Sequence, residues 1–333
     1  MADDVTLVTG GAGFLGRHVV AVLRDRDIHL RVLDTQPGHG VDGLDWVQGS
    51  VTDESVVRDA LEGVSSVVHL AAIPHLWTRD MRDFGRVNHV GTRVMLDAAR
   101  SQGVSAFVHV SSLTTRVFGS VGRQERSVRE TDIPPLDQML GPYPRSKWLA
   151  EEAARSAKSE GMPVRIAIPT MPLGPGDTNL TPPTRMILDF VQGKTPAFLE
   201  TWMNIADVRD MAGGIVDMLG TETPSEGVFL GGKNLRLSEL LQALEHVSGI
   251  KMPTSKVPGF VAEAFAHADE FVSTYLTHTP PKAPVTGVRL ARRPVTFDMS
   301  LAQDLLPAPT FSLEDTLGDT LDWFQREGLR TGA

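Results

Sequence analysis

The chain has 333 residues, a formal net charge of -9 and no cysteine. Its length fits one large domain or two smaller ones, and its acidic balance without any run of Lys and Arg argues against nucleic-acid binding. Without cysteine the chain has no disulfide, thiolate metal site or cysteine nucleophile, which fits a cytoplasmic location. The start of the chain lacks a signal-peptide pattern, and no apolar run is long enough to cross a membrane. We therefore expect a cytoplasmic protein that binds a small molecule, with no nucleic-acid or membrane partner.

Short apolar runs alternate with helical patterns through the first half of the chain. We expect strands at 5–9, 30–33, 45–49, 66–71, 107–111 and 164–168, and helices at 14–25, 54–62, 80–102 and 144–160. This alternation predicts a parallel sheet with helices on both faces. In most of these runs the apolar residues are continuous rather than alternating with polar ones, which is typical of strands buried on both sides. The predicted fold class is α/β, a Rossmann-type doubly wound parallel sheet.

The second half of the chain is less regular. Residues 169–184 are rich in Pro and Gly and are expected to form a loop. Helical patterns follow at 184–193, 205–219, 237–248, 258–276 and 313–328, with one short strand at 227–232. We expect residues 1–170, completed by 205–232, to form a dinucleotide-binding domain. Residues 171–204 and 233–330 would form a smaller C-terminal α/β domain that covers and binds the substrate.

Three glycines, Gly10, Gly13 and Gly16, lie between the first predicted strand and the first predicted helix. In a G-x-x-G-x-x-G pattern the first permits a tight turn, the second lets backbone approach a pyrophosphate, and the third lets helix pack on strand. Free N–H groups at the helix start attract phosphates. An ordinary glycine turn is the alternative, but the position between strand and helix favours a dinucleotide site.

Asp34 ends the second predicted strand, about 20 residues after the glycine turn, where a carboxylate can bind the ribose hydroxyls of adenosine. The same charge would repel a 2′-phosphate, and the following residues 35–43 contain no Arg or Lys. We therefore expect NAD rather than NADP. The alternative is a carboxylate that only starts a loop.

Tyr143 and Lys147 stand four residues apart in a chain with only two tyrosines. At this spacing both side chains share one face of a helix. A neighbouring ammonium group can lower the pKa of a phenol by roughly 1–3 units, so that the phenol exchanges protons with an alcohol or ketone. Lys147 would also hold the ribose of a nicotinamide. The alternative is an exposed Tyr lying on a Lys stem.

A serine about thirty residues earlier supports the catalytic interpretation. Ser112 follows a predicted strand, at the sheet edge where open α/β proteins bind ligands. Its hydroxyl could orient the substrate oxygen that Tyr143 serves. Ser111, Thr114 and Thr115 remain as alternatives, because spacing does not decide which hydroxyl points inward.

Six motifs occur in the order typical of one enzyme family. They are TGGAGFLG (9–16), VVHLAA (67–72), VNHVGT (87–92), FVHVSS (107–112), YPRSK (143–147) and PLGPGD (172–177). With them the chain resembles an extended short-chain dehydrogenase/reductase of the NAD-dependent epimerase/dehydratase superfamily. Within it, residues 71–92 and 174–198 are most similar to the dihydroflavonol reductase-like group, including hopanoid-associated sugar epimerase-like proteins.

The resemblance implies a role for each matching residue. Ser112, Tyr143 and Lys147 would be the catalytic triad, and Asn88 a buried structural residue near the active-site helix. Cofactor contacts would come from Phe14 and Leu15 at the pyrophosphate, from Leu70, Ala71 and Ala72 at the adenosine, and from Pro169 and Met171 at the nicotinamide. Members often dimerise through two helices per subunit, for which 80–102 and 144–160 are the candidates for a homodimer.

Two positions depart from the family pattern. Ser50 stands where an acidic residue near the adenine is frequent, and Val51 beside it is expected to pack. Met171 stands where UDP-sugar epimerases often carry Asn, and a thioether cannot make the hydrogen bond to a sugar phosphate. This substitution argues against a nucleotide-sugar substrate.

Other residues could shape a pocket. No histidine pair has the spacing of metal ligands, so we expect no metal. His75 and Trp77, after the fourth strand, could contact substrate or simply pack. Six aromatic residues could line an apolar pocket or form the core of the substrate domain: Phe190, Phe198, Trp202, Phe260, Phe265 and Phe271.

These observations predict an NAD(H)-dependent oxidoreductase that interconverts a secondary alcohol and a ketone by hydride transfer, with Tyr143 as acid and base. The alternative is an NAD-dependent sugar epimerase or dehydratase, in which the hydride leaves and returns to the same substrate. Both reactions use the same triad, so the triad does not separate them. A non-enzymatic binding module ranks last, because Tyr143 and Lys147 are both retained.

Overall fold

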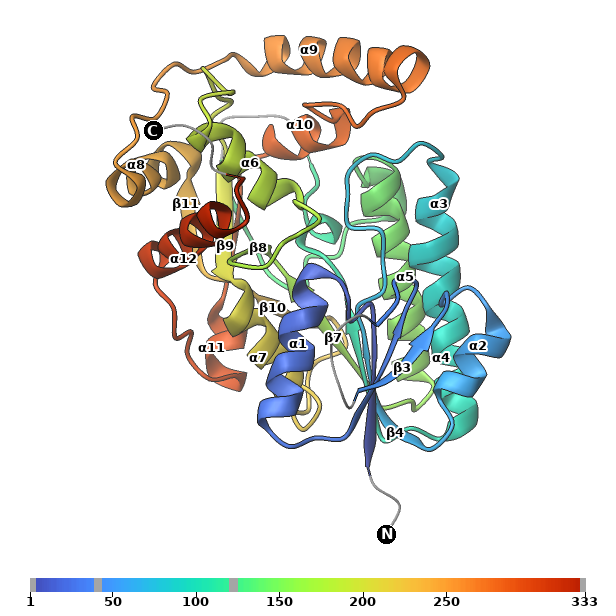
Figure 1. The fold of residues 1–333 in the computed structure, drawn as a ribbon. Coiled ribbons are helices and arrows are strands. Elements are labelled where there is room, and N and C mark those ends of the chain that lie inside the picture. The colour runs from blue at the N-terminus through green and yellow to red at the C-terminus, as the bar shows by residue number, and fades with distance from the viewer. Residues whose placement is uncertain (1–3, 39–43, 120–124, 330–333) are drawn as a thin grey trace.

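The computed structural model describes residues 4–38, 44–119 and 125–329. Among them, seven parallel strands form one sheet in the order β10-β7-β5-β4-β1-β2-β3 (Figure 1). These strands are β1 (Val5–Thr9), β2 (Leu30–Asp34), β3 (Asp45–Gln48), β4 (Val64–His69), β5 (Ala106–Val110), β7 (Val164–Pro169) and β10 (Val228–Leu230). After β3, at one edge, the chain crosses back so that β4 lies beside β1, and ligands of open α/β sheets bind at such a switch point between neighbouring strands.

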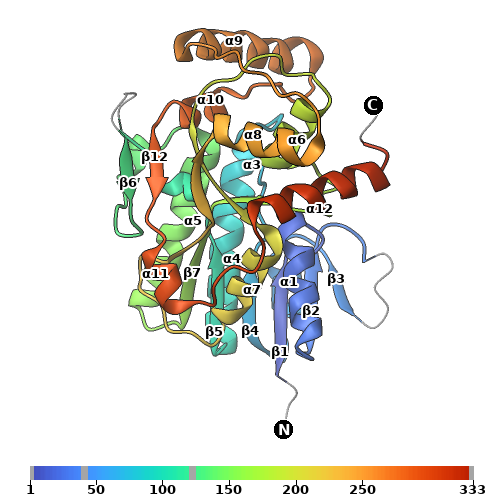
Figure 2. The ribbon, with the colours of Figure 1, turned by 90° about the vertical axis from the view of Figure 1, so that its left-hand side faces the viewer.

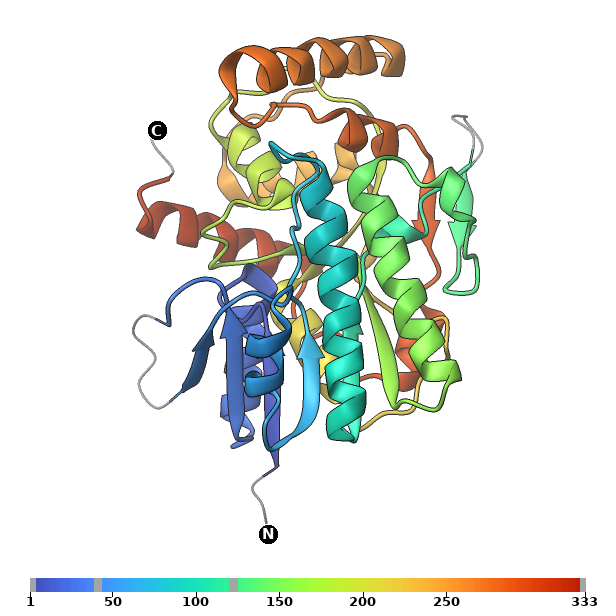
Figure 3. The same ribbon diagram turned by 90° about the vertical axis from the view of Figure 1, so that its right-hand side faces the viewer.

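Helices cover both faces of this sheet, as the apolar strands predicted. On one face α1 (Phe14–Asp25) and α7 (Val208–Asp217) share a core with Val8 and Val32. On the other face lie α2 (Glu54–Ala60), α4 (Gly91–Gln102) and α5 (Pro142–Ser159), the last two side by side in Figure 3. The predicted fold class, a doubly wound Rossmann-type α/β sheet, is confirmed.

The long helix expected at 80–102 is one rod with three parts. A short α3 (Arg82–Phe84) continues through the π-helical segment η1 (Gly85–Val90) into α4. A π-helical turn inside an α-helix frequently marks a functional site. The segment carries Asn88, whose side chain is buried.

A second, three-stranded sheet lies beyond the main one in the order β11-β9-β8. It contains β8 (Met171–Leu173), β9 (Trp202–Asp207) and β11 (Lys233–Arg236). The prediction of a loop over 169–184 is therefore wrong at β8, and the helix expected at 205–219 begins only at Val208. β8 and β9 pair with each other across some thirty residues of chain, so local sequence carries little sign of either. Separately, β6 (Arg126–Val128) pairs with β12 (Val295–Phe297).

The remaining helices are α6 (Pro182–Val191), α8 (Leu237–Ser248), α9 (Gly259–Val272), α10 (Val285–Ala291), α11 (Ser300–Leu305) and α12 (Leu313–Arg326). Most of them lie above the main sheet in Figure 2, whereas α11 packs beside β10 of that sheet. Short turns of helix are η2 (Leu113–Thr115), η3 (Leu136–Gln138) and η4 (Ser273–Thr277). A separate apolar core joins α6, α8 and α12 through Ile187, Leu240 and Phe324. Within the described ranges, no helix combines the length and apolar character that crossing a bilayer requires.

A buried ion cluster holds α5 against the chain that follows β5. Glu151 and Arg116 pair at 2.7 Å, with side chains that are 1% and 0% exposed. The second oxygen of Glu151 accepts hydrogen bonds from Ser111 Oγ at 2.5 Å and Thr115 Oγ1 at 2.9 Å, and Arg155 also pairs with the carboxylate. Burial acts to raise the pKa of Glu151, but the charge of Arg116 and these hydrogen bonds lower that pKa overall. Glu151 is therefore ionised inside the protein.

Glu151→Gln should lower the free energy of unfolding by about 3–5 kcal/mol, because Arg116 is then left as a buried cation without its carboxylate. The matched control is Glu152→Gln on the next position of α5, whose exposed carboxylate pairs with Arg155. Exposed ion pairs contribute at most about 1 kcal/mol. Urea denaturation measures both variants, and equal losses would contradict the role given to Glu151.

Two buried histidines on neighbouring strands lie with their rings 5.9 Å apart. His69 on β4 is hydrogen-bonded to Thr9 Oγ1 at 2.7 Å and to Thr92 Oγ1 at 2.9 Å. His109 on β5 has no hydrogen-bond partner for either nitrogen among the residues described. Burial lowers the pKa of His69 to about 3 and holds the pKa of His109 well below its ordinary value, with the charge of Lys147 acting in the same direction. Both rings are neutral in the folded protein.

Because these pKa values are lowered on folding, the unfolded chain binds more protons below the ordinary value of 6.5. Stability is therefore lost as the pH falls through that value. His109→Leu removes one such group. Below pH 6.5 the slope of the unfolding free energy against pH should therefore become smaller by up to about 1.4 kcal/mol per pH unit. At neutral pH the substitution should be neutral or stabilising, since the ring it removes has no hydrogen-bond partner. Urea denaturation from neutral to mildly acid pH checks this, and an unchanged pH profile would refute it.

Candidate active site

The glycine turn after β1 leaves no room for side chains at two positions. Gly10 has φ 75°, and a Cβ there would lie 2.8 Å from the backbone nitrogen of Ala71. A Cβ on Gly16 would lie 2.1 Å from the carbonyl oxygen of Gly10. These contacts allow α1 to start directly over the ends of β1 and β4. At Gly13 the nearest atom is the Gly10 carbonyl oxygen at 3.2 Å, so the turn stays open on that side.

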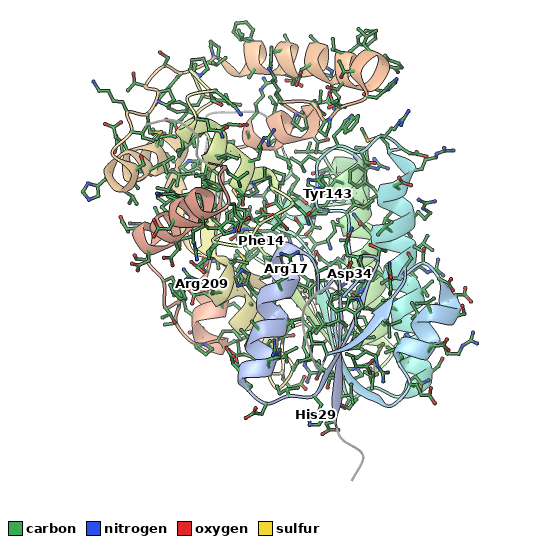
Figure 4. The ribbon with its side chains drawn as sticks, in the orientation of Figure 1. Phe14, Arg17, His29, Asp34, Tyr143 and Arg209 are labelled. Carbon is green, nitrogen blue, oxygen red and sulfur yellow. The ribbon has the colours of Figure 1, made fainter. Side chains whose placement is uncertain are left out.

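The first turn of α1 is available to an anion. The helix begins at Phe14 without a side-chain cap and with no acidic residue in its first turn. Its free N–H groups and the helix dipole attract negative charge. Leu15 is half-buried, and the Phe14 ring is buried edge-on against His18. Arg17, not anticipated from the sequence, donates from Nε to the Ala12 carbonyl at 2.8 Å and places a cation beside the turn (Figure 4).

Asp34 joins the end of β2 to the glycine turn. Its carboxylate accepts one hydrogen bond from the N–H of Ala12 at 2.9 Å and another from the N–H of Gln36 at 2.9 Å. It therefore starts a loop and also lies beside the turn, so the two interpretations from the sequence are compatible. Figure 4 shows Asp34 beside the start of α1.

The other predicted cofactor residues surround the same switch point. Ser50 turns its hydroxyl to Thr52 Oγ1 at 2.8 Å. Val51 is buried, and a methyl group of its side chain lies 2.7 Å from where a Cβ on Gly91 would be, so it packs closely on the start of α4. Leu70, Ala71 and Ala72 are half-buried in the segment that follows β4.

The hydrogen bonds of the four candidate hydroxyls after β5 show which of them can face a substrate. Ser111 and Thr115 both donate to Glu151, so they belong to the ion cluster. Thr114 donates to Ser112 Oγ from its hydroxyl at 3.1 Å and from its N–H at 3.3 Å. Because Ser112 accepts both, its own hydrogen is left to donate toward Tyr143 or a ligand.

Tyr143 is buried rather than exposed, with 8% of its surface accessible. Its ring lies edge-on to Phe84 with centroids 5.9 Å apart. Burial raises the pKa of the phenol, and a hydrogen bond with Ser112 lowers the pKa only in part. The expectation that the ammonium group of Lys147 lowers this pKa is therefore wrong, and desolvation is the stronger effect.

Lys147 lies one turn further along α5 and is also buried. Its Nζ donates to the carbonyl oxygen of Val110 at 2.6 Å, at the end of β5. Burial lowers the pKa of Lys147 to about 8, opposed by the negative charge of Glu151. The sequence analysis missed Glu151, although Tyr143, Lys147 and Glu151 follow at i, i+4 and i+8 on one helix face.

Asn88 has the buried structural position that the resemblance implied. Its side-chain oxygen accepts from the N–H of Ile73 at 2.8 Å, and its nitrogen donates to Ser146 Oγ at 3.0 Å. Ser146 in turn donates to the carbonyl of Tyr143 at 2.8 Å. The π-helical segment is thus tied to the first turn of α5.

Pro169 and Met171 mark the passage from the main sheet to the second sheet. Pro169 ends β7 and is buried, whereas Met171 begins β8, is half-buried and packs against the second core. His75 is half-buried. Trp77 is buried and donates from its indole nitrogen to Thr274 Oγ1 at 3.3 Å.

The six aromatic residues do not form one group. Phe190 and Phe198 belong to the core around the second sheet, and Arg236 lies over the half-buried ring of Trp202. The other three, Phe260, Phe265 and Phe271, are exposed on α9. For these three, the expectation of a pocket or a core is wrong.

Known proteins are similar to this chain in sequence and fold. Residues 6–230 match the NAD dependent epimerase/dehydratase family. A relative named "Putative dihydroflavonol 4-reductase", from Synechocystis sp., is 31% identical over 98% of this chain and 96% of its own. "Sterol demethylase protein B" from Methylococcus capsulatus is 28% identical over 97% of this chain and 99% of its own. The crystal structure of gox2253 is 31% identical and matches 98% of this chain and 100% of its own with a TM-score of 0.83. The chain therefore belongs to the NAD dependent epimerase/dehydratase family of extended short-chain dehydrogenase/reductases.

Proposed function

We propose that the protein is an NAD(H)-dependent oxidoreductase that interconverts a secondary alcohol and a ketone. The observation that carries the proposal is the buried group of Tyr143, Ser112 and Lys147, assembled at the carboxyl end of β5. A phenol, a hydroxyl with a free hydrogen and an ammonium group are what proton exchange with a substrate oxygen requires.

The residues around β1 fit a dinucleotide. At Gly10 and Gly16 other backbone atoms lie so close that a Cβ would not fit, and α1 begins without a side-chain cap. The pyrophosphate would lie against Gly13, Phe14 and Leu15. The adenosine would lie beside Asp34 and beside two short segments of chain. These segments are Ser50–Val51, after β3, and Leu70–Ala72, after β4. The nicotinamide would lie beside Pro169 and Met171, with its ribose held by Lys147. When bound, this cofactor supplies or accepts the hydride.

Tyr143 holds the proton that accompanies the hydride. During reduction its phenol would protonate the carbonyl oxygen of the ketone, while Ser112 donates a hydrogen bond to the same oxygen. Because burial raises the pKa of Tyr143, the phenol keeps its proton at neutral pH and is in the form that ketone reduction requires. In the reverse direction Tyr143 would first have to lose that proton.

An apolar substrate fits the features of the second domain. Met171, half-buried at the start of β8, offers a thioether rather than an amide to the substrate. One relative is named for a sterol and another for a dihydroflavonol. We assign substrate binding to residues 171–204 and 233–330, with residues 1–170 and 205–232 as the dinucleotide domain.

Cofactor turnover tests the reaction. With a panel of ketones, secondary alcohols and nucleotide sugars, an oxidoreductase changes NADH absorbance in proportion to the substrate consumed. A sugar that changes while NAD stays unconsumed would replace the proposal by the epimerase or dehydratase alternative.

Tyr143→Phe should reduce kcat by about 10²–10⁴, because the proton donor is removed while the ring remains. Affinity for the cofactor should stay nearly unchanged, as measured by titration of protein fluorescence. The chain offers a matched control in its second tyrosine, Tyr275→Phe, which changes an exposed side chain. Wild-type turnover in the Tyr143 variant would remove the catalytic assignment.

Asp34→Asn should narrow the preference for NAD over NADP by about tenfold, the factor that corresponds to about 1.4 kcal/mol of lost repulsion. Steady-state kcat/KM with each cofactor measures the ratio. Asp45→Asn, on the adjacent strand β3, is the control because it removes the same charge from an exposed pair with Arg31. A wild-type protein that already prefers NADP would show the interpretation of Asp34 to be wrong.

A further inference from the structure

The exposed large apolar side chains of the described residues gather on one element. Apart from Val90, all of them lie on α9 and its continuation η4, where Phe260 is 72% exposed and Leu276 is 69% exposed. The complete group is Phe260, Val261, Phe265, Phe271, Val272, Tyr275 and Leu276. We call it the α9 apolar face. α9 forms the outer edge of the molecule, on the side remote from the amino ends of the main strands (Figure 1).

The opposite side of α9 is polar and faces the protein. Glu263 pairs with Arg289 at 3.3 Å and also with Arg292, both from α10 and the residue after it. Asp269 accepts a hydrogen bond from the N–H of Ala283 at 2.9 Å, and Glu270 accepts one from the N–H of Val285 at 2.7 Å. The helix is therefore amphipathic, but its polar side faces the protein and its apolar side faces outward, which is the reverse of the usual arrangement of a surface helix.

This arrangement leaves the outward face without a carboxylate. All three acidic side chains of residues 259–277 are the ones just described, and each is engaged toward the chain between 283 and 292. An exposed contiguous apolar patch of this kind marks a protein or membrane contact. Aromatic and aliphatic side chains on one face of a helix are the pattern of helices that lie in a membrane interface.

The charges around the helix favour a lipid surface. Residues 251–293 contain six basic and three acidic side chains in a chain whose net charge is -9. Exposed Lys251 precedes the helix and exposed Lys282 follows it. Basic side chains that flank an apolar helical face are attracted to anionic headgroups.

A second copy of the chain fits less well. In an antiparallel two-fold pairing of α9 faces, each end of the helix meets the opposite end of its partner. Both ends are flanked by lysine, so like charges would be brought together. A bilayer with anionic headgroups has the opposite charge and meets no such repulsion.

We propose that the α9 apolar face docks the protein on an anionic lipid surface, with α9 lying in the plane of the headgroups. The 19 residues from 259 to 277 would cover about 28 Å at the rise of an α-helix. The sequence predicted no membrane partner, because no continuous apolar run is long enough to span a bilayer. Here the apolar residues recur at helical spacing, and the acidic ones between them are turned toward the protein.

Docking would bring the candidate active site close to the lipid. Thr274 in η4 accepts a hydrogen bond from Trp77, which lies in the segment after β4. In α10, Thr286 packs closely against Gly141, two residues before Tyr143. The docking element thus contacts the segment after β4, while α10, which packs on α9, contacts the turn before Tyr143, so an apolar substrate would enter the site from the lipid side.

Flotation with vesicles of equal parts phosphatidylcholine and phosphatidylglycerol tests the proposal on the full chain without substrate. The wild type should float with the vesicles. Phe265→Ser with Phe271→Ser should lower the bound-to-free ratio by at least about tenfold, because two exposed apolar side chains are removed. Val90→Ser is the matched control, since it removes an exposed apolar side chain away from α9. Lys251→Glu with Lys282→Glu should weaken binding to these vesicles more than binding to phosphatidylcholine alone.

Three results would overturn the proposal. One is a wild-type protein that stays with the unbound fraction, and another is undiminished binding by the phenylalanine double variant. The third is a wild-type dimer in sedimentation velocity, a monomeric double variant, and no vesicle binding by either protein. That result would make the face a contact between two copies of the chain. Because the assay uses no substrate or cofactor, each of these results leaves the proposed hydride transfer untouched.

Discussion

The buried carboxylate of Glu151 is the constraint on which the candidate site depends. Tyr143 and Lys147 lie on α5, whereas Ser112 follows β5, so helix and strand must be held in one register. Glu151 does this by accepting a hydrogen bond from the hydroxyl of Ser111 and by forming an ion pair with Arg116. Lys147 adds a hydrogen bond to the carbonyl oxygen of Val110. With Ser111 drawn to Glu151, the hydroxyl of Ser112 is the one that interacts with Tyr143.

Desolvation then sets the electrostatics of the site. It raises the pKa of Tyr143 and lowers the pKa of Lys147 to about 8, and the charge of Glu151 opposes the second shift. A neutral phenol beside a hydroxyl donor is suited to give a proton to a developing alkoxide. Burial, rather than the spacing of Tyr and Lys alone, therefore decides that the phenol carries its proton in the folded chain.

The same balance of burial and charge explains where the fold departs from the sequence patterns. The runs at β1, β4, β5 and β7 are mostly apolar and largely buried, so these strands could be predicted without knowledge of their partners. β8 has three residues and contains Pro, β9 contains Asn204 and Asp207, and both form because they pair with each other and, for β9, with β11. α9 was recognisable as a helix, but its orientation depended on Arg289 and Arg292, which lie about thirty residues later and draw its acidic side inward.

By itself, the sequence determined the doubly wound sheet, the glycine turn, the acidic end of β2, and the pairing of Tyr143 with Lys147. These features depend on local periodicity, on the conformations open to glycine and on spacing along one helix, all of which act over a few residues. Only the tertiary structure decided that Ser112 rather than Ser111 accompanies the phenol, that the phenol is desolvated, and that three phenylalanines of α9 face outward. Each of these outcomes depends on contacts between residues distant in sequence, because burial and ion pairing are properties of the packed chain.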